Sequence, residues 1–431
     1  MCRAHYNDDN DNTSSTGFDG LFEHVLRTDN KGNRNLCIRT YRRVKQIRLL
    51  IYVPFVAQIV PLICTNGSWA TSGSVINTGG SGTGSTQLSG PFDVFIDSNQ
   101  NIYVADSNNQ RVQQWQSGQT NGSTIAGVTS QSGNGFNQFN SPTSVFVDIN
   151  DNLYVADLNN YRVQRWASNS VVGTTVAGGN GQGPALTQLG TTYSIYVDTN
   201  DSVYVSELGN HRVTKWASGA SSGVVVAGGA GAGSSATQLQ YPVGVTIQTS
   251  TGNIYIADQS NHRVQRVSPR MIGNKFFWLS TSYRKNPAGS LTGTTVAGQT
   301  GTCGIGSSQL CFPKSVQFDT LGNMYIVDSS NNRIQRWAPN AVSGTTILQQ
   351  GSGSGLSQLN APNGGKFDLL GNYYVVDTTN NRIMKYASSC VPTTTASTIA
   401  TSGSSLMSSS TSAMQYLYIS SNIFWSIDAT P

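Results

Sequence analysis

The chain has 431 residues, of which only 11% are charged and 37% are hydrophobic, and 46 are glycine. This composition excludes a long coiled coil or helical bundle, which needs many Glu, Lys, Leu and Ala residues. Few charges, many glycines and many β-branched residues indicate an all-β protein with many turns. Basic residues are in excess only within residues 1–64 and 268–286, and the remainder holds 13 basic against 15 acidic residues. A basic surface for nucleic acid is therefore not expected on the remainder.

Residues 49–64 read LLIYVPFVAQIVPLIC and follow a basic stretch at 42–48. A basic region before about 15 apolar residues is typical of a secretory signal, and it is short for a membrane span of about 20 residues. We expect a signal peptide or a signal-anchor at 49–64. The preceding residues 1–48 are either a disordered leader or a spurious upstream extension of the gene model. Both interpretations place the rest of the chain outside the cytosol. The alternative is a buried apolar segment.

Six copies of one pattern follow, and each copy contains four short apolar runs separated by Gly, Asn, Asp or Pro. The copies open at Pro91, Pro142, Thr192, Pro242, Pro313 and Pro362. The first two runs are apolar on both faces, which is typical of strands buried inside packed sheets. Four short antiparallel strands in each unit of about 50 residues, repeated six times, predict a six-bladed β-propeller over residues 66–400.

The second and third runs, such as NIYVADSNNQRVQQW at 101–115, resemble the NHL repeat, which is named for an Asn-His-Leu signature. The triplets at 210–212 and 261–263 come closest to that signature, although Arg replaces Leu in both. The resemblance covers all six units, about 300 residues. It implies the propeller fold but no single function, because propellers host many functions.

Only five fourth strands lie between repeats, so the ring needs a sixth strand from one end of the chain. The two candidates are residues 73–77 (GSVIN) and residues 397–401 (STIAT). We expect the first to pair with the last blade, so that both chain ends close the ring.

Two segments interrupt or follow the repeats. Residues 270–285 are aromatic and basic where other copies have Gly and Ser. They are either a binding loop on one face of the propeller or a translation of normally untranslated sequence retained in the gene model. The Ser-rich tail at 401–431 either caps the ring or is disordered.

The cysteines and glycosylation sequons agree with secretion. Cys303 and Cys311 flank one loop of the fifth unit and are expected to form a disulfide, and Cys64 could meet Cys390 if the chain ends close the ring. The sequons Asn-x-Ser begin at Asn66, Asn121 and Asn200.

An acidic residue, an Asn and an Arg recur in every copy with the spacing Asp-x-x-Asn-x-Arg, as in Asp106, Asn109 and Arg111. A residue present in every blade holds the blade together. We therefore interpret this set as a clamp on the turn, in which the acidic residue and the Arg form a surface ion pair and the Asn favours the turn conformation. His211 and His262 occupy one variable slot of this turn, and two histidines are too few for a catalytic zinc site. We expect no metal and no cofactor.

The remaining candidates are side chains that differ between the copies of this turn. Leu158, Tyr161, Leu208, His211 and His262 replace the polar residues of other copies, and we expect them to project from one rim of adjacent blades. Exposed apolar and aromatic residues on a rigid face are typical of a partner site, although local packing on each other is the alternative.

The sequence therefore predicts a non-catalytic, secreted or membrane-tethered monomer that binds a protein or peptide through loops on one face. The resemblance also extends to propeller enzymes, peptidyl-amidating lyases and gluconolactonase-like hydrolases, which implies a channel metal held by His or acidic residues. The positions expected to face the channel offer no such set; they are Phe95, Phe146, Tyr196, Thr246, Gln317 and Lys366. RNA binding, known in some NHL proteins, is the second alternative.

Overall fold

The computed structural model describes residues 24–28, 34–38, 69–272, 275–277, 292–348 and 351–388. The chain divides into two compact units, one formed by Met1–Phe55 with Ile399–Pro431 and the other by Val56–Thr398. The described part of the first unit is an antiparallel pair, β1 (His24–Thr28) and β2 (Arg34–Ile38). The expected signal at 49–64, the tail at 401–431 and the pairing of Cys64 with Cys390 lie outside the described residues.

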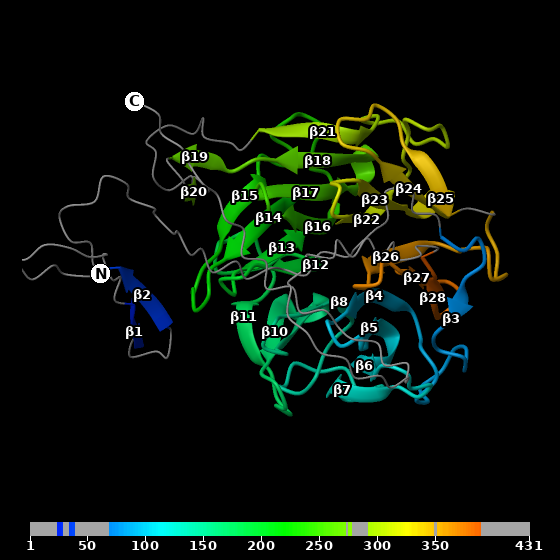
Figure 1. Ribbon diagram of the computed structural model, residues 1–431, viewed down its shortest axis with the longest axis horizontal. Coiled ribbons are helices and arrows are strands. Elements are labelled where there is room, and N and C mark those ends of the chain that lie inside the picture. Colours follow the sequence, from blue (N-terminus) through cyan, green and yellow to red (C-terminus); the bar gives the residue numbers. More distant parts are fainter. Residues whose placement is uncertain are drawn as a thin grey trace, which may run out of the picture. The chain divides into compact units, whose positions relative to one another are not determined.

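The second unit is a six-bladed β-propeller with four antiparallel strands in each blade, as predicted (Figure 1). The strands of the first three blades are β4 (Pro91–Ile96), β5 (Ile102–Asp106), β6 (Arg111–Trp115) and β7 (Ser123–Gly127); β8 (Pro142–Val147), β9 (Leu153–Asp157), β10 (Arg162–Trp166) and β11 (Thr174–Gly178); and β12 (Thr192–Val197), β13 (Val203–Glu207), β14 (Arg212–Trp216) and β15 (Val224–Gly228).

The fourth, fifth and sixth blades follow the same order. Their strands are β16 (Pro242–Gln248), β17 (Asn253–Asp258), β18 (Arg263–Val267) and β21 (Gly293–Gly298); β22 (Pro313–Phe318), β23 (Met324–Asp328), β24 (Arg333–Trp337) and β25 (Thr345–Leu348); and β26 (Pro362–Phe367), β27 (Tyr373–Asp377), β28 (Arg382–Tyr386) and β3 (Ser74–Val75). The aromatic insertion begins with a separate antiparallel pair, β19 (Arg270–Ile272) and β20 (Lys275–Phe277), and its other residues are outside the described part.

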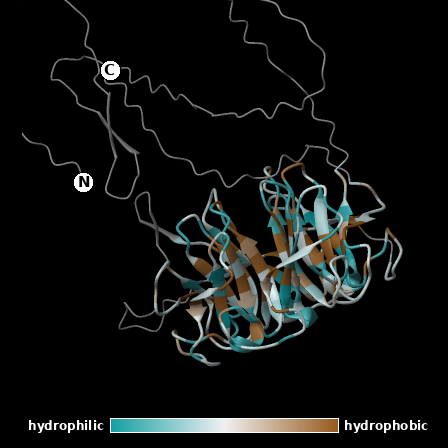
Figure 2. Cartoon of the chain, turned by 90° about the horizontal axis from the view of Figure 1, so that it is seen from below, coloured by the Kyte–Doolittle hydropathy of each residue, from teal (hydrophilic) through white to brown (hydrophobic). Residues whose placement is uncertain are grey.

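Burial follows the position of each strand in its blade. The second strand of every blade buries its last five residues, which explains why this run is apolar on both faces. The fourth strand is the most exposed and ends the sheet at the outside of the ring. Figure 2 shows apolar strand segments within the blades and hydrophilic segments in many connecting loops. No helix in the described part of the chain is long and apolar enough to cross a membrane.

The N-terminal segment closes the ring, as expected for residues 73–77. β3 pairs with β28, and Val75 lies opposite Met384. Asn77 reinforces the pairing, because its Nδ2 donates to the Asn381 carbonyl at 2.8 Å and its Oδ1 accepts from the Ile383 amide at 2.8 Å. The last blade is therefore completed by residues from both ends of the propeller sequence.

The repeated turn links the second and third strands. Four blades form it as a 3-10 helix, namely η1 (Ser107–Asn109), η2 (Leu158–Asn160), η3 (Gln259–Asn261) and η5 (Ser329–Asn331). The residue after this segment has a positive φ in all six blades, between 51° and 59°. The conformation is left-handed, which reverses the chain direction between the two strands.

The acidic and basic residues of the turn form an ion pair in every blade, which confirms the predicted clamp. The pairs are Arg111–Asp106 (2.7 Å), Arg162–Asp157 (2.8 Å), Arg212–Glu207 (2.9 Å), Arg263–Asp258 (2.7 Å), Arg333–Asp328 (2.6 Å) and Arg382–Asp377 (2.7 Å). The expectation of a surface pair was wrong, because every carboxylate is fully buried and no arginine side chain is more than 10% exposed.

The burial arises because the Gly/Ser loop before each blade folds over the clamp. In the first blade, Arg111 donates to the carbonyls of Thr83 and Gln87 at 2.7 and 3.1 Å. Asp106 accepts the amide of Ser89 at 2.7 Å. Breaking such a buried pair by removing one partner costs about 3–5 kcal/mol, so the clamp fixes each loop to its own blade.

Candidate functional site

The first strand of each blade lines the axis of the propeller, since the six first strands contact one another around the ring. Each first strand runs from the face that carries the repeated turns to the face that carries the hairpins between first and second strands. We call these faces the turn face and the hairpin face. The channel between the first strands therefore has a mouth on each face.

The six side chains expected to face the channel do so, because all of them line one cavity on the axis. They are Phe95, Phe146, Tyr196, Thr246, Gln317 and Lys366. Aromatic rings fill one side of this layer, since the rings of Phe95 and Phe146 lie 4.9 Å apart and those of Phe146 and Tyr196 lie 5.6 Å apart.

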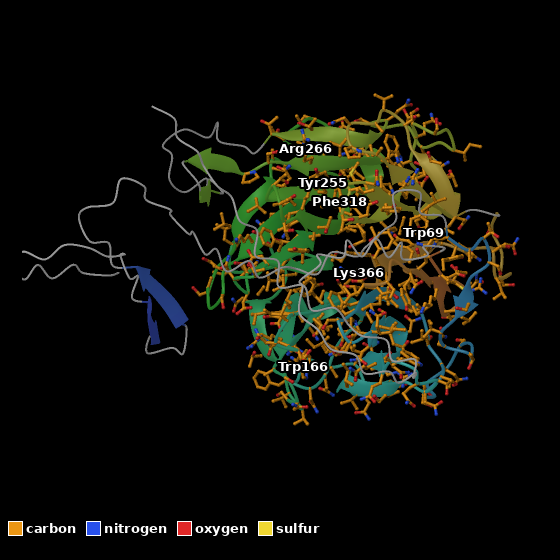
Figure 3. The ribbon with its side chains drawn as sticks, viewed as in Figure 1. Trp69, Trp166, Tyr255, Arg266, Phe318 and Lys366 are labelled. Atoms are coloured by element: carbon orange, nitrogen blue, oxygen red, sulfur yellow. A yellow bond between two sulfur atoms is a disulfide. The ribbon has the colours of Figure 1, made fainter. Side chains whose placement is uncertain are left out.

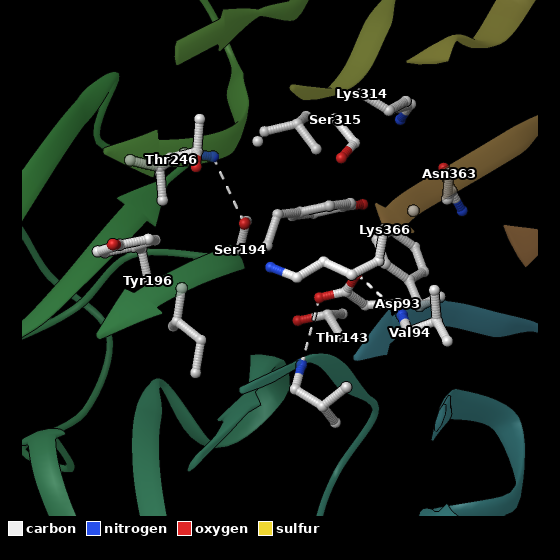
Figure 4. Close-up of a pocket in the computed structure, with 18 of the residues that line it drawn as sticks. Asp93, Val94, Thr143, Ser194, Tyr196, Thr246, Lys314, Ser315, Asn363 and Lys366 are labelled. Atoms are coloured by element: carbon white, nitrogen blue, oxygen red, sulfur yellow. Dashed lines mark hydrogen bonds between the residues drawn. The ribbon is translucent and has the colours of Figure 1, made fainter. Parts of the chain in front are cut away.

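Lys366 crosses the channel from β26 toward Ser194, on the other side of the ring (Figure 4). Its Nζ lies 4.8 Å from the centre of the Phe95 ring and 5.8 Å from that of Phe146. No described residue accepts a hydrogen bond from this ammonium or forms an ion pair with it. Burial lowers the pKa of Lys366, and the charge of Asp93 opposes this shift. Figure 3 places Lys366 near the middle of the ring, with Trp166 and Arg266 toward its outside.

Asp93 lies one layer closer to the turn face. Its carboxylate accepts hydrogen bonds from Ser144 Oγ at 2.6 Å, from the Val94 amide at 2.9 Å and from the Val145 amide at 3.3 Å. Burial raises its pKa despite these donors. Ser144 and Ser194 fill this position in the next two blades and accept the amides of Ile195 and Val245, so the layer also joins neighbouring blades. Asp93 therefore has its own hydrogen-bond donors, and the charge of Lys366 also acts to lower its pKa.

The turn mouth is narrow. Phe92 of the first blade and Tyr193 of the third meet edge to face across the channel, with ring centres 5.1 Å apart. The cavity below them has a volume of about 50 Å³. Lys314 stands beside them, with Nζ 5.7 Å from the Tyr193 ring and 3.2 Å from Gln259 Oε1. This mouth admits water but no ligand of substantial size.

The hairpin mouth is wide and holds a cavity of about 330 Å³. Its walls include apolar side chains of three blades, Ile96, Ile247 and Phe318, together with polar hairpin residues such as Thr249 and Ser250. Lys366, Phe95, Tyr196, Thr246 and Gln317 are shared with the axial cavity and form its inner end. A cation with no acceptor among the described residues thus lies at the inner end of a pocket of mixed polar and apolar lining, which also includes Asp319. The size of the pocket is within the range of small-molecule sites.

The rim residues predicted from the sequence lie in the repeated turns but are half-buried. Tyr161 packs against a hydrophobic core cluster that spans the second, third and fourth blades. His211 Nδ1 accepts the amide of Tyr241 of the next blade at 3.2 Å, and their rings lie 4.8 Å apart. Leu158 and Leu208 have no polar role and keep part of their surface exposed.

The histidine slot joins neighbouring blades. In five blades its side chain accepts the backbone amide that precedes the next first strand; the pairs are Gln110–Ser141, His211–Tyr241, His262–Phe312, Asn332–Ala361 and Asn381–Gly90. The histidines therefore perform a task that Gln and Asn perform elsewhere. Sequence reasoning missed this because the acceptor and the donor belong to different repeats.

Cys303 and Cys311 form the expected disulfide, and Asn121 and Asn200 are exposed. The channel metal that the enzyme resemblance implies does not fit the six axial side chains, which include no His, Cys or carboxylate, and Asp93 alone is an incomplete ligand set. Sequence reasoning also missed Asp93 and Lys314. Each is a charged residue at a repeat position where other copies have Ser, Gly or uncharged side chains, and this contrast was a usable signal.

The model of the NHL repeat matches residues 88–115 and 239–267. No curated protein matches the sequence. Among solved structures, a protein of unknown function from Bacteroides thetaiotaomicron is 15% identical with a TM-score of 0.54, covering 74% of this chain and 76% of that one. An auxiliary nutrient binding protein from the same organism is 15% identical with a TM-score of 0.51, covering 70% of each chain. At these identities the likeness shows the fold.

Proposed function

We propose that this NHL-repeat propeller is a non-catalytic binding protein, and that the hairpin mouth takes a ligand with a carboxylate on an apolar body. The observation that carries the proposal is the Lys366 ammonium, which has no hydrogen-bond acceptor among the described residues and ends a partly apolar cavity of about 330 Å³. Lys366 is half-buried, and partial removal of a cation from water without a hydrogen-bond acceptor has a cost. A carboxylate that reaches this ammonium therefore gains a charge-assisted hydrogen bond. The auxiliary nutrient binding proteins of similar fold give independent support for a binding role.

The carboxylate can come from the C-terminus of a peptide or from a small organic acid, and calorimetry of the full chain separates the two. One arm uses short peptides ending in Leu or Phe with a free or amidated C-terminus, and the other uses aliphatic and aromatic monocarboxylic acids. We expect the free acids of at least one arm to bind and the amides to fail. Equal binding of acid and amide, or no binding in either arm, would overturn the proposal.

Two lysine variants localise the site. Lys366→Met should weaken binding by about 10- to 150-fold, the equivalent of a charged hydrogen bond of about 1.5–3 kcal/mol. Lys314→Met is the matched control, because Lys314 lies at the opposite mouth and already has Gln259 as an acceptor. A similar loss in both variants would show that the effect is one of overall charge rather than of the site.

The turn face is a second candidate, for a protein or peptide partner. Leu158 and Leu208 occupy equivalent positions in adjacent blades and remain partly exposed where other turns have Ser, Thr or Gln. Lys314 places a cation on the same face, so the partner would combine an apolar and an acidic residue. Selection from a displayed peptide library should enrich that combination, and Leu158→Ser with Leu208→Ser should abolish capture without a change in melting temperature. Enrichment that survives both substitutions would reject this site.

We also propose that the propeller acts outside the cytosol, as a monomer that is secreted or tethered through 49–64. The Cys303–Cys311 disulfide and the exposed sequons at Asn121 and Asn200 support this compartment. N-terminal sequencing of the expressed protein, with a glycosidase mobility shift, tests it. An unglycosylated protein that starts at Met1 would contradict it.

A further inference from the structure

The disulfide of the fifth blade lies beside a histidine of the fourth blade. One ring nitrogen of His262 and the sulfurs of Cys303 and Cys311 all lie within 4.8 Å of one another. Within the described residues, this is the only group of three metal-ligating side chains that lie together. We propose that the three residues form a Zn²⁺ site when the disulfide is reduced.

The loop that carries the cysteines does not need the disulfide for its shape. Cys303 forms a parallel bridge with Leu310, and every other blade forms the same bridge without a cysteine. Those bridges are Ser81–Leu88, Ser132–Phe139, Gln182–Leu189, Ala232–Leu239 and Ser352–Leu359. Reduction therefore leaves the two cysteine backbones where the fold holds them, with Cα atoms 4.4 Å apart.

The other two ligand positions are also fixed by repeated interactions. The Cys311 amide donates to Asp328 Oδ1 at 2.6 Å, and the equivalent amide donates to the clamp acid in each of the other blades. His262 is held in a left-handed conformation with φ of 54° and stacks edge to face on Phe312 at 4.7 Å. Its Nδ1 accepts only one long hydrogen bond, 3.3 Å from the Phe312 amide, which a metal ion can displace.

The chemistry of the set matches a zinc ion. A thiol reductant transfers two electrons to the disulfide and becomes oxidised, which leaves two thiols on the protein. Zn²⁺ then binds both sulfurs as thiolates and releases their two protons. In a tetrahedral site with Zn–S bonds of about 2.3 Å the sulfurs lie about 3.8 Å apart, which rotation of the freed side chains allows. Cys303 is exposed, so water can fill the fourth position.

The test titrates the full chain with Zn²⁺ under argon, in competition with a chromophoric chelator, before and after thiol reduction. Serine replaces the other cysteines in all samples to remove their contribution; these are Cys2, Cys37, Cys64 and Cys390. We expect one bound Zn²⁺ after reduction and none before it, and cobalt substitution should give a thiolate charge-transfer band. Zinc bound equally by both forms, or by neither, overturns the proposal.

Two histidine variants separate metal ligation from blade contact. His262→Gln should keep the contact to the next blade, as Gln110 does, but should weaken Zn²⁺ binding by more than about 100-fold, since even outer-shell partners are worth 10–100-fold. His211→Gln is the matched control, because His211 makes the same contact to Tyr241 and belongs to no group of metal-ligating side chains in the described part of the chain. Unchanged affinity in His262→Gln, or an equal loss in both variants, contradicts the assigned ligand set.

Discussion

The third blade differs from the others in two residues that contact each other, and this pair permits a quantitative test of the clamp. Glu207 replaces the Asp of the other five blades, and Thr214 replaces a Gln that four of them have. Glu207 Oε1 accepts from Thr214 Oγ1 at 2.7 Å and from Arg212 Nε at 3.0 Å. The longer side chain of Glu207 thus reaches the shorter side chain of Thr214. Both residues are fully buried.

We expect each single change to destabilise the protein and the double change to be nearly neutral. Glu207→Asp withdraws the carboxylate and leaves the Thr214 hydroxyl without an acceptor for its proton, although its oxygen still accepts from Trp216 Nε1 at 3.1 Å; the expected cost is about 1–3 kcal/mol. Thr214→Gln forces a larger side chain against Glu207, which costs about 1–3 kcal/mol. The double variant recreates the combination found in four other blades, so its loss should be below about 1 kcal/mol and the coupling energy about 1–3 kcal/mol.

Urea unfolding of the four proteins, followed by tryptophan fluorescence and circular dichroism, gives the coupling energy. The reciprocal cycle in the first blade, Asp106→Glu with Gln113→Thr, is the matched control and should show the same sign. If the losses in free energy of unfolding for Glu207→Asp and Thr214→Gln simply add in the double variant, the two residues do not compensate each other in the third blade.

Three other perturbations test the ring, the channel and the blade contacts. Asn77→Ala should lower the free energy of unfolding in urea by about 2–5 kcal/mol, because the buried Ile383 amide and the Asn381 carbonyl lose their partner; a loss below about 0.5 kcal/mol would contradict this role. Lys366→Met should raise the melting temperature in calorimetry, since it removes a half-buried cation that has no hydrogen-bond acceptor among the described residues, and a lower value would show that the ring contacts and the charge of Asp93 outweigh the cost of burial. Burial lowers the pKa of His262 from 6.5, so the unfolded chain binds a proton at this imidazole more readily than the folded one, and stability falls as pH drops below 6.5. His262→Gln should therefore flatten the plot of melting temperature against pH. Parallel plots for the variant and the original protein would exclude the effect.

Repetition made the fold predictable from the sequence. Six copies of one pattern locate the strands and turns, and the NHL resemblance follows from the same residues. The ion pair between Asp106 and Arg111 was predictable from its fixed spacing, but its burial was not. The covering loop comes 24 to 28 residues earlier in the chain, and no local pattern indicates that it folds back over the clamp.

The candidate site was predictable only in part. Counting along the repeat placed Lys366 on the channel, but the repeat pattern could not show that no described residue accepts a hydrogen bond from its ammonium. That property depends on which side chains other blades place around it, such as the rings of Phe95 and Phe146. The same limit applies to Phe92 and Tyr193, which meet across the ring although 101 positions separate them in the sequence.

The pairing of β3 with β28 imposes an order on biosynthesis. Asn77 leaves the ribosome 306 positions before Ile383, the residue whose amide it accepts. At about 5–20 residues per second, the early strand waits roughly 15–60 s for its neighbour. During this interval the nascent protein is an open arc with two unsatisfied edges, and an edge of that kind can recruit another polypeptide. The ring therefore stays open at both edges until translation has passed the final blade.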